Sequence, residues 1–155
     1  MIKTAIVMIM FVIANYAYAQ DADMSEEMRL LGDCRGCSFE DVDFSELRLM
    51  GINLKETRLS AVDFHAAQLS IAVFNGSVLR DVNFASANLR GASFTGATLI
   101  NVSFEGADLR GAVFEGALLE NTDLQPALLC NTQMPNDLMD NSDCNCLCRR
   151  ISDGD

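Results

Sequence analysis

The chain has 155 residues, with 11 Lys and Arg residues against 22 Asp and Glu residues, and a formal net charge of −11. This length fits a single domain, and a hydrophobic content of 50% excludes a wholly disordered chain. The charge argues against nucleic-acid backbones and anionic membrane surfaces as partners because both would repel the protein, and a single histidine leaves little material for histidine-based chemistry.

The first 19 residues have the features of a secretory signal peptide. Lys3 gives a positive start, an apolar run occupies residues 5–14, and Ala17 and Ala19 stand at the −3 and −1 positions of a cleavage site. The run is shorter than the ~20 apolar residues that a membrane-spanning helix needs. We therefore predict cleavage after Ala19, no membrane span, and a periplasmic or secreted bacterial protein, in a compartment where disulfides persist.

Residues 20–36 are expected to form an N-terminal cap with a short helix at residues 23–31. Acidic residues lie in its first turn, Met24, Met28 and Leu31 share one helical face, and Gly32 ends the helix. We expect this helix to cover the first coil of the region that follows it.

A period of five residues runs through positions 37–136. Every fifth position from Phe39 to Met134 is Leu, Phe or Met, and the position two residues earlier is mostly Ala, Val or Thr. This period fits neither an α-helix nor a β-strand, so the chain must turn once per quintet with one large and one small side chain inward. Four such turns close a square, so the 20 quintets predict five coils in which residues 20 apart stack.

Steps of 20 residues predict the interior columns of this coil, with two Leu columns facing each other and two Phe columns facing each other. The phenylalanines of these core ladders are Phe44, Phe64, Phe84 and Phe104 in one column and Phe74, Phe94 and Phe114 in the other. Stacked rings would stabilise a column by ~0.5–1.5 kcal/mol per pair beyond their burial. Glycines two residues after the large position, such as Gly96 and Gly116, suit corners with positive φ.

Segments such as Ala87–Gly91 and Ala107–Gly111 follow the pattern A(D/N)LxG, and residues 37–136 resemble the pentapeptide-repeat family. The resemblance implies an all-β fold, a right-handed quadrilateral β-helix. Leu47 and Ile52 occupy small-residue positions, so the regularity is expected to be weakest in the first coil. The chain contains no catalytic triad, phosphate loop or metal motif, and we predict no enzyme activity, no catalytic residue and no cofactor.

Six cysteines lie in two sets at the ends of the repeats: Cys34 and Cys37, then Cys130, Cys144, Cys146 and Cys148. The sets are roughly 20 Å apart along the stack, whereas a disulfide needs Cα atoms within about 7 Å. Each set therefore pairs internally unless the tail folds back, and the four late cysteines allow three connectivities. Cys34 to Cys37 resembles the CxGC opening of exported bacterial pentapeptide-repeat proteins, and residues 130–144 resemble their C-terminal cap. This resemblance implies the pairs Cys34–Cys37 and Cys130–Cys144.

Residues 137–155 are expected to form a Cys-rich C-terminal cap and tail. Leu118 and Leu128 point outward in the last coil, and either this tail or a second subunit is expected to cover them. A homodimer through the C-terminal end is therefore one hypothesis. In the other, a Cys130–Cys144 bridge holds apolar tail residues over the last coil and hides Leu118 or Leu128. The apolar residues of this cap and tail are Leu138, Met139, Leu147 and Ile151.

Other chemistry has weaker support in the sequence. Cys34 and Cys37 have the spacing of a redox pair, but no βαβ pattern surrounds them. The late cysteines do not have ordinary zinc-knuckle spacing, and residues 140–143 lack the distal Glu of a calcium loop. His65 lies on an outward position beside Asp63, with no nucleophile or base near it in the pattern.

The main hypothesis is an exported structural or protein-interaction module, a rigid non-catalytic rod with an unknown protein partner in the cell envelope. The family resemblance adds an alternative, because some pentapeptide-repeat proteins are acidic DNA mimics that bind a type II topoisomerase. The charge fits this alternative, but the signal peptide does not, and the acidic column of Asp43, Asp63 and Asp123 is interrupted. A Cys-based metal-binding or redox protein is the remaining alternative.

Overall fold

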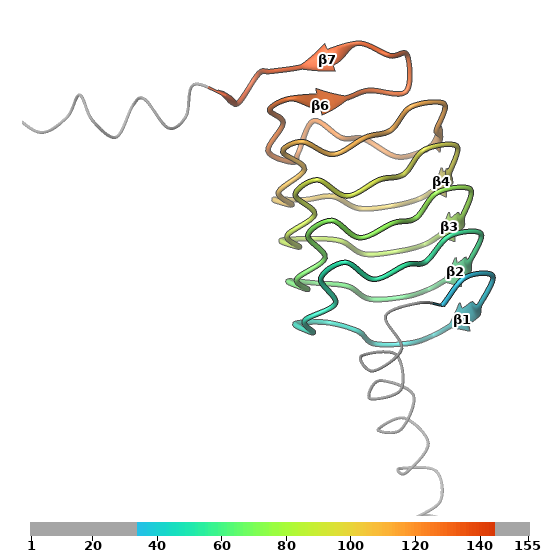
Figure 1. The fold of residues 1–155 in the computed structure, drawn as a ribbon. Helices are drawn as coiled ribbons and strands as arrows, with labels where there is room; N and C mark the ends of the chain where they lie inside the picture. The colour runs from blue at the N-terminus through green and yellow to red at the C-terminus, as the bar shows by residue number, and fades with distance from the viewer. Residues whose placement is uncertain (1–33, 145–155) are drawn as a thin grey trace, which may run out of the picture. The chain divides into compact units, whose positions relative to one another are not determined.

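The computed structural model describes residues 34–144, which form an all-β solenoid followed by a small hairpin (Figure 1). The predicted signal peptide, the helix expected at residues 23–31, and Cys146 and Cys148 lie outside these residues. Within residues 34–144, no helix has the length and apolar character needed to cross a membrane.

One side of the solenoid is a parallel sheet of five short strands stacked in chain order. The strands are β1 (Ser38–Glu40), β2 (Arg58–Ser60), β3 (Val78–Arg80), β4 (Thr98–Ile100) and β5 (Leu118–Glu120). Each strand pairs with the next at an offset of 20 residues, as Phe39 does with Leu59. Isolated parallel bridges at the same offset hold the other three sides, beginning at Asp43, Arg48 and Asn53. The four-sided coil predicted from the period of five is therefore confirmed.

The corners explain why one position of the quintet favours glycine. At the corner after Phe94, the Ala97 N–H donates to the Phe94 carbonyl at 2.9 Å, and Gly96 has a φ of +64°. A bond from residue i+3 to residue i with positive φ at i+2 is typical of a type II β-turn. Several other corners place Glu, Ser, Asn, Asp or Ala in the same left-handed region. These corners accept the local strain because the ladders on both sides fix the chain.

The interior contains the predicted columns. Phe64 and Phe84 stack with centroids 5.2 Å apart, Phe74 and Phe94 stack at 4.8 Å, and the columns meet edge to face, with Phe84 and Phe94 at 6.0 Å. The seven ladder phenylalanines are at most 1% exposed: Phe44, Phe64, Phe74, Phe84, Phe94, Phe104 and Phe114. This arrangement combines the two ring geometries that aromatic quadrupoles favour, so the core is close-packed through the length of the stack.

The coil count is smaller than predicted. Four strand pairings link β1 to β5, so the solenoid makes about four regular turns rather than five. The last round is distorted at Pro126, which follows Glu46, Ala66, Ser86 and Gly106 in a corner column where all four have positive φ. Proline is fixed near a φ of about −65° and cannot adopt that conformation. The expected irregularity of the first coil is seen in part, because Ile52 is buried and Asn53 keeps its bridge to Val73, but Leu47 is only half-buried, whereas the alanines that follow it in its column are buried.

After the last coil the chain forms an antiparallel hairpin of β6 (Thr132–Gln133) and β7 (Met139–Asp140). The Met134 N–H donates to the Leu138 carbonyl at 2.8 Å, and Asp137 adopts a φ of +63°. The chain therefore reverses at residues 134–138 instead of turning another right-angled corner. The hairpin lies at the end of the stack beyond β5 (Figure 1).

Candidate interaction surface at the C-terminal end

The N-terminal disulfide joins Cys34 and Cys37, whose Cα atoms are 5.5 Å apart. The Cys34 N–H donates to the Asn53 carbonyl at 2.7 Å, and the Gly36 N–H donates to the Lys55 carbonyl at 2.8 Å. The small loop closed by the disulfide is thereby attached to the next coil through the same ladder as the repeats. This arrangement gives the cysteine pair a structural role at the start of the solenoid.

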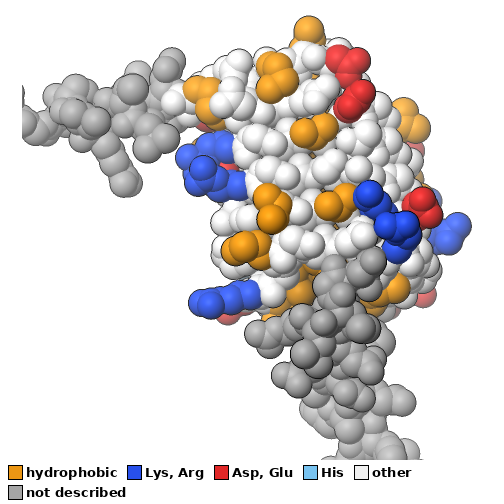
Figure 2. Space-filling view, viewed as in Figure 1, with side chains coloured by type: hydrophobic (Ala, Val, Ile, Leu, Met, Phe, Trp, Pro, Cys, Tyr) orange, Lys and Arg blue, Asp and Glu red, His pale blue; other side chains and the backbone are white. Residues whose placement is uncertain are grey.

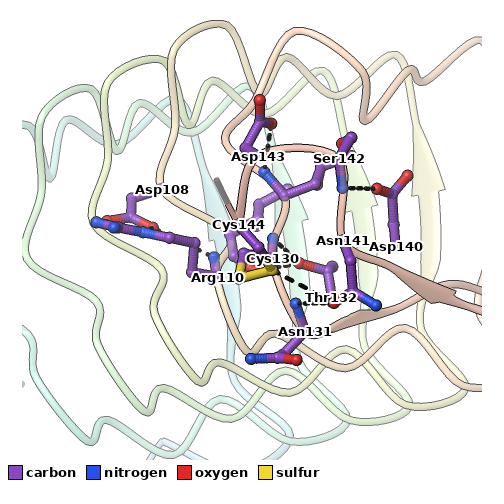
Figure 3. Close-up of a disulfide and its surroundings, with 12 residues drawn as sticks. Asp108, Arg110, Cys130, Asn131, Thr132, Asp140, Asn141, Ser142, Asp143 and Cys144 are labelled. Atoms are coloured by element: carbon purple, nitrogen blue, oxygen red, sulfur yellow. Dashed lines mark hydrogen bonds and ion pairs between the residues drawn. A yellow bond between two sulfur atoms is a disulfide. The ribbon is translucent and has the colours of Figure 1, made fainter. Parts of the chain in front are cut away.

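The C-terminal disulfide joins Cys130 and Cys144, whose Cα atoms are 4.8 Å apart (Figure 3). The Asp143 N–H donates to the Leu129 carbonyl at 2.8 Å, and the Leu129 N–H donates to the Asp143 carboxylate at 2.9 Å. The Asn131 N–H donates to the side-chain oxygen of Asn141 at 2.9 Å. Residues 141–144 thus satisfy backbone groups on this side of the last coil, where no further coil exists to pair with them.

Loss of the C-terminal disulfide should destabilise the protein more than loss of the N-terminal one. Its cysteines are 14 residues apart, against 3 for Cys34 and Cys37. In the chain-entropy model the longer loop contributes up to ~3 kcal/mol and the shorter one about 2 kcal/mol. We expect urea unfolding to show the larger loss for Cys130→Ser with Cys144→Ser. A larger loss for Cys34→Ser with Cys37→Ser would contradict this expectation.

The last coil and the hairpin expose four large apolar side chains, which we call the terminal apolar surface. They are Leu118 (67% exposed), Leu128 (43%), Leu138 (65%) and Met139 (53%), and Leu118 and Leu128 lie on opposite sides of the coil. The expectation that the bridged segment hides Leu118 or Leu128 is therefore wrong for the residues up to 144. The physical reason is the hairpin, in which Met139 pairs with Gln133 and both Leu138 and Met139 stay exposed instead of being buried on the last coil. Figure 2 shows hydrophobic side chains at this end and also further down the same face.

The same end is acidic. Residues 111–144 contain six acidic residues and no Lys or Arg, namely Glu115, Glu120, Asp123, Asp137, Asp140 and Asp143. Basic residues within the repeats are confined to the earlier part of the chain, the last being Arg110. An apolar surface rimmed by carboxylates suits a partner that combines apolar and basic groups.

Arg90 and Arg110 occupy one outward column, and Asp108 lies beside them. The Arg110 side chain forms two contacts with the Asp108 carboxylate, from Nε at 2.8 Å and from Nη2 at 2.5 Å. Partial burial opposes ionisation of Asp108, but hydrogen bonds from the Arg110 side chain and backbone, and the charges of Arg110 and Arg90, outweigh it and lower the pKa of this carboxyl. The pair relieves the repulsion between the two arginines.

The lowered pKa of Asp108 gives a signed pH prediction. Its carboxylate stabilises the fold fully above the pKa of an unfolded Asp, and this contribution is lost as the pH falls through the lower pKa of the folded protein. The stability difference between wild type and Asp108→Asn should therefore shrink as the pH drops from neutral to about 2. Urea unfolding across this range tests it, and a difference that grows on acidification would contradict it.

Side-chain ladders on the outer faces were missed by the sequence analysis. Amide groups link residues 20 apart, and one ladder runs from Asp81 through Asn101 to Asn121, with N···O distances of 2.9 and 2.7 Å. Asn83 likewise donates to Asp63 at 3.0 Å, so the residue that interrupts the acidic column also bonds to it. The sequence contains a pattern that predicts these ladders, because the Asp and Asn residues recur at the same step of 20 as the core residues. Hydrogen-bonded amide side chains therefore connect neighbouring coils on the outer faces, and the acidic columns are not continuous.

The residues considered for other chemistry have structural partners. Asp63 accepts the backbone N–H of His65 at 2.8 Å, and Asp140 accepts the backbone N–H of Ser142 at 2.9 Å. The disulfide takes two of the four late cysteines out of the thiolate form that zinc requires. Among residues 34–144, no group of three or more His, Cys, Asp or Glu side chains is arranged to hold a metal ion.

The solved structures that are similar to this chain include two pentapeptide repeat proteins. HetL, a pentapeptide repeat protein involved in the regulation of heterocyst differentiation in a Nostoc cyanobacterium, is 30% identical with a TM-score of 0.66. The match covers 70% of this chain and 51% of HetL, so the chain spans about half the length of that protein. A pentapeptide repeat protein from the thylakoid lumen of Arabidopsis thaliana is 26% identical with a TM-score of 0.52, over 74% of this chain and 77% of the other.

A comparison with curated proteins finds no match. The family description "Pentapeptide repeats" matches this sequence in overlapping segments at residues 37–76, 57–96, 77–116 and 87–125, which together span more than half of the chain. The same segments contain the columns, corners and ladders of the solenoid. The chain therefore belongs to the pentapeptide-repeat family.

Proposed function

We propose that this protein is an exported, non-catalytic interaction module that binds a protein partner in the cell envelope through the terminal apolar surface. The observation that carries the proposal is the exposure of Leu118, Leu128, Leu138 and Met139, the large apolar side chains that the last coil and the hairpin leave uncovered. Leu118 and Leu128 point outward from opposite sides of that coil, so a partner that covers both would extend over its end. The partner is either an envelope protein or a second copy that forms a homodimer through this end.

Three observations support export. The sequence opens with the features of a signal peptide, for which we propose cleavage after Ala19. One disulfide lies at each end of the solenoid, and such bonds persist in oxidising compartments. A similar pentapeptide repeat protein comes from the thylakoid lumen, which lies outside the cytosol. A periplasmic or secreted location accounts for the first two, and the third is consistent with it.

The DNA-mimic alternative has weaker support. A mimic of duplex DNA needs continuous rows of carboxylates, whereas amides interrupt the acidic columns here, as Asn83 does after Asp63. The proposed export also separates the protein from a cytoplasmic topoisomerase. Protein that keeps Met1 and remains in the cytoplasm would contradict the export proposal and favour this alternative.

Substitution at the terminal apolar surface should abolish association. We expect Leu118→Asp to lower capture of an envelope partner, or self-association measured by light scattering, by about tenfold or more, because a carboxylate cannot enter an apolar interface unpaired. Met50→Asp is the matched control, since Met50 is 68% exposed near the other end of the solenoid. Equal losses for the two variants would contradict the proposed site. Recovered envelope material should begin at Gln20, which N-terminal sequencing checks.

A further inference from the structure

The outer edge of β5 remains open at the end of the last coil. Within residues 34–144, no strand pairs with this edge. The edges of two neighbouring sides are covered by the hairpin and by Asp143, and a third contains Pro126, which has no N–H to offer a further strand. Leu119 in β5 is only half-buried, whereas Leu59, Leu79 and Leu99 of the same column are at most 1% exposed. The core is therefore incompletely covered above β5.

The segment after the last coil still has the 20-residue register of the solenoid. Leu138 and Met139 stand 20 residues after Leu118 and Leu119, so in a sixth strand Met139 would cover the open end of the Leu column. Asn141 stands 20 residues after Asn121, at the end of the amide ladder.

The corner that a sixth strand requires is also compatible with the sequence. Pro135 occupies the first corner position, where a φ near −65° is favourable. Asn136 follows Gly76, Gly96 and Gly116 in the column that takes positive φ, and Asn tolerates this region better than most residues. Residues 135–141 are therefore able to form one more side of the coil. Two acids oppose it, because Asp137 would face inward and Asp140 would lie beside Glu120.

The C-terminal disulfide is incompatible with that sixth strand. In a continued coil, residue 150 would stack on Cys130. Cys144 precedes residue 150 by six positions, so it would lie around a corner from Cys130. That separation is roughly 10 Å or more at strand spacing, whereas the Cα atoms of the bonded cysteines are 4.8 Å apart. The bond requires the chain to reverse at residues 134–138, which is the hairpin observed. The disulfide and the sixth strand thus exclude each other.

We propose that the outer edge of β5 is an acceptor site for a sixth strand formed by residues 138–140, and that the Cys130–Cys144 disulfide keeps this site open. Reduction by a dithiol breaks the disulfide, transfers two electrons and two hydrogens to the cysteines, and leaves the reductant as a disulfide. Residues 138–140 then pair in parallel with β5, with Leu138 beside Leu118 and Met139 over Leu119. The new contacts offset part of the stability lost with the closed loop.

The inference rests on the proposed function for its biological meaning. Met139 belongs to the terminal apolar surface and would turn inward over Leu119, whereas Leu138 would join Leu118 in an outward column. The oxidised and the reduced protein would therefore present different apolar surfaces to a partner at this end. The structural switch itself is testable without any partner, so its failure and the failure of the proposed function can be told apart.

Amide hydrogen exchange in the full-length chain tests the switch. In the regular coils the Asn101 N–H donates to the Glu120 carbonyl at 3.0 Å, and in a sixth strand the Asn121 N–H would donate to Asp140 in the same way. We expect the Asn121 amide to exchange about tenfold more slowly in Cys130→Ser with Cys144→Ser than in the oxidised wild type. Wild-type protein treated with dithiothreitol should show the same slowing, together with a nuclear Overhauser contact between Leu119 and Met139.

A corner variant controls for other effects of the lost disulfide. Adding Asn136→Val to the double serine variant should restore fast exchange at Asn121, because a β-branched residue disfavours the positive φ of the corner. Adding Asn136→Gly should keep exchange slow. The proposal is overturned if the Asn121 amide exchanges in the double serine variant as fast as in the oxidised wild type. This outcome counts against it both when the Asn101 amide stays protected and when the last coil frays. Slow exchange that persists with Asn136→Val would also overturn it.

Discussion

Replacing Phe84 by Ala should lower the free energy of unfolding by ~3–5 kcal/mol. Phe84 is fully buried in the middle of its column, stacked on Phe64 and Phe104 and edge to face with Phe74 and Phe94. Its removal leaves a cavity that the ladders above and below cannot close, because 20-residue spacing fixes both neighbouring coils. Urea denaturation followed by circular dichroism would measure the loss.

Met50→Ala is the control for this substitution. Met50 is a large apolar side chain on an outward position and is 68% exposed, so its truncation should cost less than ~1 kcal/mol. Similar losses for Phe84→Ala and Met50→Ala would show that the inward and outward positions of the quintet have been assigned wrongly. A spectrum dominated by α-helix would contradict the fold itself.

Replacing Gly96 by Pro should destabilise the solenoid by ~3 kcal/mol or more. Gly96 has a φ of +64°, which proline cannot adopt, and its N–H donates to the Glu115 carbonyl at 2.9 Å. The substitution therefore strains a corner and breaks a bond between two central coils. Pro126 has a comparable position in the last coil, where the chain departs from the regular pattern. Thermal unfolding and exchange of the amides around residue 96 would measure the effect.

Glu115→Pro is the matched control, because it places proline in the equivalent corner of the next coil, one position before the residue with positive φ. Glu115 precedes Gly116 and occupies the first position of its corner, where the φ of proline is favourable. Pro135 occupies the same column one coil later. We expect a change within about 1 kcal/mol, of either sign. If Glu115→Pro were as harmful as Gly96→Pro, the left-handed corner position would not be the cause.

The terminal coil shows where local sequence rules and tertiary structure disagree. Met139 and Asn141 keep the register of the columns that precede them, so by pattern alone the coil would continue. The structure instead has the hairpin of β6 and β7, because a bond between residues 14 apart outweighs a local preference. Pattern analysis missed this competition because a disulfide is a long-range constraint that no periodicity records.

The sequence by itself determined the four-sided coil, the step of 20 between stacked residues and the identity of the buried columns. It could do so because each quintet repeats one local turn, and identical turns can bury their large side chains only by stacking. Tertiary structure alone decided two features: the reversal of the chain into the hairpin of β6 and β7, and the exposure of Leu138 and Met139. Each depends on what lies beside a residue in the neighbouring coil or beyond the last one, and at the end of a stack the neighbour that would set the conformation is missing.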